Sequence, residues 1–262
     1  MEIQLIYKIL CILYTMEPID IYTLPCARNV CNQVSREVFQ FPKISIAHVT
    51  VNPGEASNWH YHNTTTEIYF ILEGEGILYE SAMLQEPEKA WIADRNTLRV
   101  IHPSTAHKLK NTGTTTLEHL VFALPPFNPD DVQMLKDTDI ELKPQRLVCP
   151  SNPMTALDGI LAYDLLSDED SKRLDISLAV GILPARRKTH HHHHSRLDQV
   201  YFVTQGQGKM LLGQDIYEVK KDNLMMIPKN TGHNLENTTQ DELFILRLSS
   251  PRYQESEFQY SG

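Results

Sequence analysis

Cysteine is scarce in this chain, and so are basic clusters and long apolar runs. The 262 residues include four cysteines, and no two of them form a Cys-x-x-Cys pair, so the sequence predicts neither a disulfide scaffold nor a thiolate metal site. Reduced thiols are typical of a cytoplasmic protein, which is the location we expect. Lys and Arg total 24 against 33 Asp and Glu, and the resulting net charge of −9 argues against a nucleic-acid partner.

The apolar segment at residues 3–14 is too short to span a membrane. Lys8 interrupts it, and no small-residue cleavage site of a signal peptide follows. We therefore expect no membrane partner. Met16 offers a second start, so residues 1–15 are predicted to be either a short packed arm or a misassigned start.

Histidine, in contrast, is abundant, and the chain repeats itself. Five of the 12 histidines form the run His190–His194. Glu67–Gly76 aligns with Gln199–Gly208 at an offset of 132, and Thr105–Asn111 aligns with Thr231–Asn237 at an offset of 126. The sequence therefore predicts two copies of one unit, with a shorter connecting loop in the second copy.

Each copy is predicted to be all-β, as a sandwich or barrel. Short segments rich in Ile, Val, Tyr, Phe and Thr alternate with Gly, Pro and Asn turns. The predicted strands include Ile44–Val51, Glu67–Leu72, Leu117–Ala123, Ile176–Leu183, Gln199–Thr204 and Glu242–Leu248. Helical periodicity is limited to stretches such as Asp130–Lys136 and Thr155–Leu166, and the acidic run Asp168–Asp170 is typical of a solvated hairpin.

Four residues of the first copy form a candidate metal site. His60 and His62 are two apart in a predicted strand, so their side chains point the same way. Glu67 begins the next strand, and His107 comes from a distant one. Three imidazoles and a carboxylate suit Fe, Mn, Ni, Cu or Zn. The alternative is a hydrogen-bonded polar cluster that holds no metal.

The spacing of these residues resembles that of the cupin family. Gly54 is followed by five residues, His60-Tyr-His62, four residues, Glu67, six residues and Gly74, as in the first cupin motif. His107 and Asn111 match the end of the second motif. The resemblance covers about residues 40–127 and 173–253. It implies a bicupin: two tandem double-stranded β-helix (jelly-roll) barrels, with a metal at the centre of a barrel.

This interpretation divides the chain into an N-terminal arm with pairing strands (1–39), cupin domain 1 (40–127), an inter-domain linker (128–172) and cupin domain 2 (173–262). The second motif of the family opens with glycine, whereas Asn96 and Asp222 hold that place here. Asn and Asp tolerate a left-handed backbone better than other non-glycine residues, so we expect the turn to be kept.

The second copy places His192, His194, Gln199 and His233 at the four ligand positions. Two interpretations stay open for this second site. One is a genuine three-histidine metal site in which neutral Gln199 binds weakly or supports a ligand. The other is a degenerate copy kept for packing, or a histidine-rich surface loop.

Aromatic residues flank both candidate sites. Tyr69 shares a face with Glu67, and Tyr201 is its counterpart; each either donates a phenol proton to a substrate or packs inside its barrel. Trp59 and Tyr61 are predicted to point away from the metal, and to cover the barrel or line a subunit contact.

The resemblance implies a metal-dependent enzyme that acts on a small polar metabolite. The predicted ligands are His60, His62, Glu67 and His107, with Glu67 and Tyr69 as catalytic residues. We favour Fe(II) and a dioxygenase reaction; Zn, Ni or Mn with a redox-neutral isomerase, lyase or cyclase reaction is the alternative. A non-catalytic cupin that binds a small ligand is the third hypothesis. Both a homodimer and a monomer fit the sequence.

Overall fold

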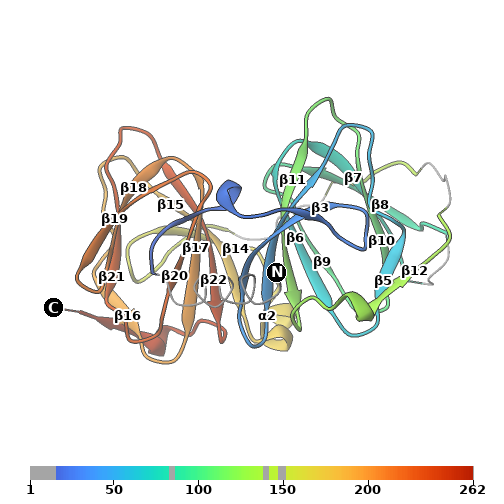
Figure 1. The fold of residues 1–262 in the computed structure, drawn as a ribbon. Helices are drawn as coiled ribbons and strands as arrows, with labels where there is room; N and C mark the ends of the chain where they lie inside the picture. Colours follow the sequence, from blue (N-terminus) through green and yellow to red (C-terminus); the bar gives the residue numbers. More distant parts are fainter. Residues whose placement is uncertain (1–15, 83–85, 138–141, 147–151, 262) are drawn as a thin grey trace. The chain divides into compact units, whose positions relative to one another are not determined.

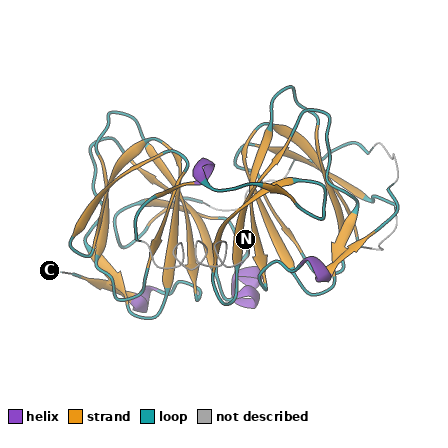
Figure 2. Cartoon of the chain, viewed as in Figure 1, coloured by secondary structure: helices purple, strands orange, loops and turns teal. Residues whose placement is uncertain are grey.

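The computed structural model describes residues 16–82, 86–137, 142–146 and 152–261. These residues form two compact units, one within Leu24–Cys149 and one that combines Pro150–Gly262 with residues up to Thr23. Strands dominate both units (Figures 1 and 2), which confirms the predicted all-β class. The alternatives for residues 1–15 fall outside the described residues, and the predicted domain boundaries stay a prediction.

The first unit is a barrel built from two antiparallel sheets. Side chains from both sheets, such as Val49, Ile71, Leu78 and Leu109, meet in one buried core. One sheet has the order β2-β3-β4-β11-β6-β9 and the other the order β12-β5-β10-β7-β8. The strands are β2 Ala27–Arg28, β3 Val34–Gln40, β4 Ser45–Val51, β5 His60–His62, β6 Thr66–Glu73, β7 Glu75–Ser81, β8 Lys89–Asp94, β9 Leu98–Ile101, β10 Ala106–Asn111, β11 Leu117–Leu124 and β12 Val132–Met134.

The second unit repeats this plan. Its sheets have the orders β1-β20-β17-β22-β15-β14-β13 and β19-β18-β21-β16-β23. The strands are β1 Ile19–Asp20, β13 Met154–Thr155, β14 Leu161–Asp164, β15 Ser177–Leu183, β16 His192–His194, β17 Asp198–Gln205, β18 Gln207–Leu212, β19 Asp215–Lys220, β20 Asn223–Ile227, β21 His233–Asn237, β22 Leu243–Ser250 and β23 Phe258–Tyr260. The series β4-β11-β6-β9 thus corresponds to β15-β22-β17-β20, as the internal repeat predicted.

All six strands predicted by composition are present, each within two residues of its expected ends. The residues that replace glycine also behave as expected. Asn96 and Asp222 have φ angles of 67° and 70°, so both sit in the left-handed region that Asn and Asp tolerate. The turn at the start of the second motif is therefore kept without glycine.

Three local predictions are wrong. Asp130–Lys136 is a 3-10 turn (Pro129–Asp131) followed by β12, because this segment pairs with β5 at the edge of the sheet. Thr155–Leu166 begins at the last residue of β13 and contains β14, which pairs with β13 as a hairpin, since pairing of β14 with β15 overrides the local helical pattern.

The acidic run that we predicted to be a hairpin begins helix α2 (Asp168–Leu174). Ser167 caps this helix, because its side chain accepts a hydrogen bond from the Asp170 N–H. Three acids in the first turn and two bases in the last turn match the helix dipole. Among the described residues, no helix has the length and apolar character needed to span a bilayer.

Candidate metal centres

The first barrel brings the four predicted ligands together at its centre. His60 and His62 alternate with Tyr61 along β5, so both imidazoles are buried. His107 lies opposite His60 in the register of β10 with β5, and Glu67 is the second residue of β6. One ligand atom from each residue lies within 4.8 Å of the others, and each side chain is almost inaccessible to solvent.

Backbone carbonyls orient two of these imidazoles. Nδ1 of His60 lies 2.7 Å from the Asn58 carbonyl oxygen, and Nδ1 of His107 lies 3.1 Å from that of Thr105. A carbonyl oxygen can only accept a hydrogen bond, so Nδ1 must carry the proton in both rings. In the neutral ring Nε2 then presents its lone pair to the centre of the cluster, which is the arrangement that a metal-binding histidine requires.

The Glu67 carboxylate faces these lone pairs. Its Oε2 lies 3.1 Å from Nε2 of His107 and 3.4 Å from Nε2 of His62, and it accepts a hydrogen bond from the Tyr69 hydroxyl at 3.2 Å. Burial opposes ionisation of Glu67, but the two histidines outweigh it and hold the pKa of this carboxyl well below its usual range. The site therefore favours an ionised Glu67 carboxylate next to the imidazole nitrogens of His62 and His107.

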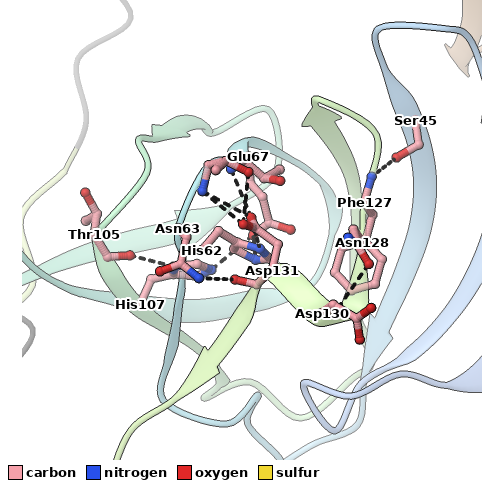
Figure 3. A network of polar contacts seen from close by, with 12 residues as sticks. Ser45, His62, Asn63, Glu67, Thr105, His107, Phe127, Asn128, Asp130 and Asp131 are labelled. Atoms are coloured by element: carbon pink, nitrogen blue, oxygen red, sulfur yellow. Dashed lines mark hydrogen bonds and ion pairs between the residues drawn. The ribbon is translucent and has the colours of Figure 1, made fainter.

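A second carboxylate, which the sequence did not indicate as a site residue, stands behind His62. Asp131 accepts hydrogen bonds from the backbone N–H groups of Thr64 and Thr65, and its Oδ2 lies 3.7 Å from Nδ1 of His62 (Figure 3). Burial lowers the pKa of His62, yet Glu67 and Asp131 together raise it above its usual value. The Asn128-Pro-Asp-Asp131 turn signal was visible in the sequence, but the approach of this turn to β5 was not.

The second barrel assembles three histidines in the same way. His192 lies opposite His233 in the register of β16 with β21, and the ligand atoms of His192, His194 and His233 lie within 4.8 Å of one another. Nδ1 of His192 and Nδ1 of His233 again contact backbone carbonyl oxygens. All three side chains are buried, which rules out the surface-loop interpretation for these residues.

Gln199 occupies the place of Glu67 in this second cluster. Its Nε2 lies 3.3 Å from Oγ of Ser249, while its Oε1 has no hydrogen-bond partner among the described residues. Burial lowers the pKa of His192, lowers that of His194 to about 4 and holds that of His233 well below its usual range. These imidazoles are therefore neutral near pH 7, as a cation requires.

The flanking aromatic residues divide into two groups. Tyr69 and Tyr201 point into their barrels, where both are buried. Trp59 is also buried, and it packs with Tyr79, Ala90 and Ala106 in a separate apolar cluster that Tyr61 partly covers. This fits the first of the two predicted roles, cover of the barrel; the second, a subunit contact, stays a prediction.

Solved structures of very different sequence share this fold. Oxalate decarboxylase from Bacillus subtilis aligns with a TM-score of 0.65 at 12% identity, over 91% of this chain and 77% of that one. The formate complex of the Lactobacillus farciminis oxalate decarboxylase aligns at 0.67 and 13% identity, over 94% and 88%. A 7S globulin from Momordica charantia aligns at 0.67 and 13% identity, over 92% and 85%. At such identities these likenesses concern the fold alone.

Comparison of sequences, in contrast to these likenesses of fold, shows the family of the chain. An uncharacterised protein of Methanocaldococcus jannaschii is 34% identical over 101 residues, which are 38% of this chain and 81% of that protein. The cupin domain family matches residues 47–122 and again residues 179–248, one match in each barrel. The chain therefore belongs to the cupin family, and its two cupin domains make it a bicupin.

Proposed function

We propose that this bicupin is a metal-dependent enzyme that acts on a small polar metabolite. In this proposal a divalent transition-metal ion is held in the first barrel by His60, His62, Glu67 and His107. The donor set fits such an ion, since three imidazole nitrogens and one carboxylate oxygen suit Fe, Mn, Ni, Cu and Zn alike. The compact approach of these buried donor atoms, all within 4.8 Å of one another, supports the proposal.

The contact between His107 and Glu67 supports this proposal most directly. Nδ1 of His107 donates to the Thr105 carbonyl, so in the neutral ring Nε2 carries a lone pair and is an acceptor. The Glu67 oxygen that lies 3.1 Å away is also an acceptor. Two buried acceptors at this distance repel each other unless a proton or a cation lies between them. A metal ion satisfies both groups and also Nε2 of His62, which has no hydrogen-bond partner among the described residues.

A bound ion would supply Lewis acidity and open coordination positions at the centre of the barrel. The protein groups around it have separate tasks. Glu67 would accept a proton from the substrate, and the Tyr69 hydroxyl, which donates to Glu67 Oε2, holds the carboxylate in place and would pass a proton on. Asp131 holds His62 from behind. Burial of all four ligands excludes bulk water.

Fe(II) with a dioxygenase reaction is the reaction class that we propose first, because an open histidine and carboxylate site suits Fe(II) and dioxygen. The second candidate is a redox-neutral isomerase, lyase or cyclase reaction; the oxalate decarboxylases that share the fold make a decarboxylation the form of it to test first. Substrate-dependent oxygen uptake separates the two, since turnover that persists without air eliminates the dioxygenase.

The metal is tested by elemental analysis of protein purified without added metal. We expect the His107→Ala variant to lose the ion of the first barrel, while the His233→Ala variant, its match in the repeat, keeps it. Glu67→Gln should keep some metal and lose turnover. A wild-type protein that binds none of Fe, Mn, Ni, Cu or Zn when these are supplied would refute the proposal.

A further inference from the structure

The second barrel contains a cavity of about 240 Å³ that reaches its histidine cluster. His192, His194 and Gln199 line the inner part, together with Arg247 and Ser249 of β22. The volume is below the range of drug-sized ligand sites, roughly 300–1,000 Å³. It therefore suits a ligand of metabolite size, next to the position that a metal ion would occupy.

The internal repeat shows which residues make this cavity polar. Gln199 lies opposite Ser249 and Tyr201 lies opposite Arg247 in the register of β17 with β22. At the same places in the first barrel, Glu67 lies opposite Ala123 and Tyr69 lies opposite Val121. The second barrel has therefore replaced a carboxylate by an amide, a valine by an arginine and an alanine by a serine.

These replacements make the second barrel more positive. Exchange of Glu for Gln removes one negative charge, and exchange of Val for Arg adds one positive charge. Asp158 balances the arginine, because its Oδ2 lies 3.0 Å from a terminal nitrogen of Arg247. Three neutral imidazoles then leave both charges of a divalent ion uncompensated, whereas Glu67 cancels one of them in the first barrel.

Arg247 has hydrogen-bonding capacity left for a ligand. A guanidinium carries five N–H donors, and Asp158 and the Tyr201 hydroxyl account for only part of them. The side chain is 13% exposed and lines the cavity. Oε1 of Gln199 and both ring nitrogens of His194 also have no hydrogen-bond partner among the described residues. The inner part of the cavity therefore presents several polar groups that can bind a ligand or a metal ion.

The other charged side chains that line the cavity are more exposed to solvent. Asp168 pairs with Arg252 and Lys172, and Asp164 is exposed. Of the acids among the described residues that line the cavity, Asp158 is the buried one, and Arg247 neutralises it.

We propose that the second barrel binds a small carboxylate in this cavity, with Arg247 as the residue that recognises the anion beside a divalent ion on His192, His194 and His233. The proposal rests on a metal in the second barrel and is independent of the metal proposed for the first. A planar guanidinium can hold a carboxylate with two parallel hydrogen bonds, and the ligand supplies the negative charge that Gln199 lacks.

Titration calorimetry on the protein loaded with Mn²⁺ tests the proposal directly. The probes are pyruvate, oxalate and malonate, with oxamide and malonamide as uncharged counterparts. Methylammonium is the cationic probe, which would bind if the cavity recognised cations through Asp158. We expect the carboxylates to bind and the other probes to show no heat of binding. Removal of the metal should weaken carboxylate binding at least tenfold.

Variants assign the binding to one barrel. Arg247→Gln combined with Asp158→Asn removes the ion pair without leaving a lone buried charge, and it should weaken carboxylate binding at least tenfold. Arg247→Lys keeps the charge but loses the bidentate geometry, so it should show an intermediate loss even if the double variant does not fold. Lys209→Gln is the control from the surface of the same barrel, where Lys209 pairs with Glu218 outside the cavity, and it should bind as wild type does.

Four results would overturn the proposal: no carboxylate binding, equal binding of the uncharged amides, binding of methylammonium in place of the carboxylates, or binding that His107→Ala abolishes and the Arg247 variants leave unchanged. Failure of the first-barrel metal would appear separately, as normal carboxylate binding in a protein whose His107→Ala variant has an unchanged metal content.

Discussion

Replacement of His119 by isoleucine removes an imidazole that the first barrel keeps buried and neutral. His119 lies on β11 with no exposed surface, and neither ring nitrogen has a hydrogen-bond partner among the described residues. Its ring packs against Tyr69 at 4.8 Å between centroids. The corresponding residue of the second barrel is Ile245, which is also buried, so the repeat itself shows that isoleucine fits this position.

The expected effect depends on pH. Burial, with a smaller contribution from His48, lowers the pKa of His119 from 6.5 to about 3. Between these two values the unfolded chain binds a proton that the folded chain does not, so His119 destabilises the protein as the pH falls below 6.5. Each pKa unit is worth about 1.4 kcal/mol, so the penalty is about 2 kcal/mol at about pH 5 and close to zero at about pH 7.5.

Urea unfolding at these two pH values, with a chelator present, measures the difference. The free energy of unfolding of His119→Ile relative to wild type should rise by about 2 kcal/mol on going from about pH 7.5 to about pH 5. The other histidines are present in both proteins and cancel in the comparison. His190→Gln, at an exposed position, is the control and should show no such rise. Parallel stability curves for wild type and His119→Ile would refute the reasoning.

Further substitutions test the fold by urea unfolding. A Cβ at Gly208 would lie 2.2 Å from the Glu236 carbonyl oxygen, whereas one at Gly213 would meet nothing within 4 Å. We expect Gly208→Ala to lower the free energy of unfolding by about 3 kcal/mol and Gly213→Ala by about 1 kcal/mol. Equal losses would contradict the close approach of β18 to β21. The buried Asn111 side chain makes three hydrogen bonds to backbone groups, so Asn111→Ala should cost about 3 kcal/mol and leave the metal content unchanged; loss of metal from a folded variant would show that it acts on the ligands. Ser167→Ala removes the cap of α2 and should cost about 1 kcal/mol; no change would mean that the cap is dispensable.

Much of the fold could be predicted because its signals are local. Strands with a period of two, turns at Asn96 and Asp222, and two aligned copies of one motif appear in the order of the residues alone. The shared direction of His60 and His62 could be predicted for the same reason, since two histidines two apart in a strand must face the same side. Glu67 and His107 lie on other strands, and the resemblance to the cupin motifs predicted them. Local signals failed where pairing decided the outcome, as in β12, β13 and β14.

The chemical difference between the two barrels, a second carboxylate in the first and a polar cavity in the second, could not be predicted from local sequence patterns. Asp131 reaches His62 from 69 positions along the chain, and Arg247 meets Asp158 across 89. The sequence by itself determined the repeat, the all-β class and the histidines that face inward, because these follow from spacing within one or two strands. Only the tertiary structure decided which second carboxylate supports His62 and which barrel contains the polar cavity, because both depend on strand register and on side chains that distant segments bring into contact.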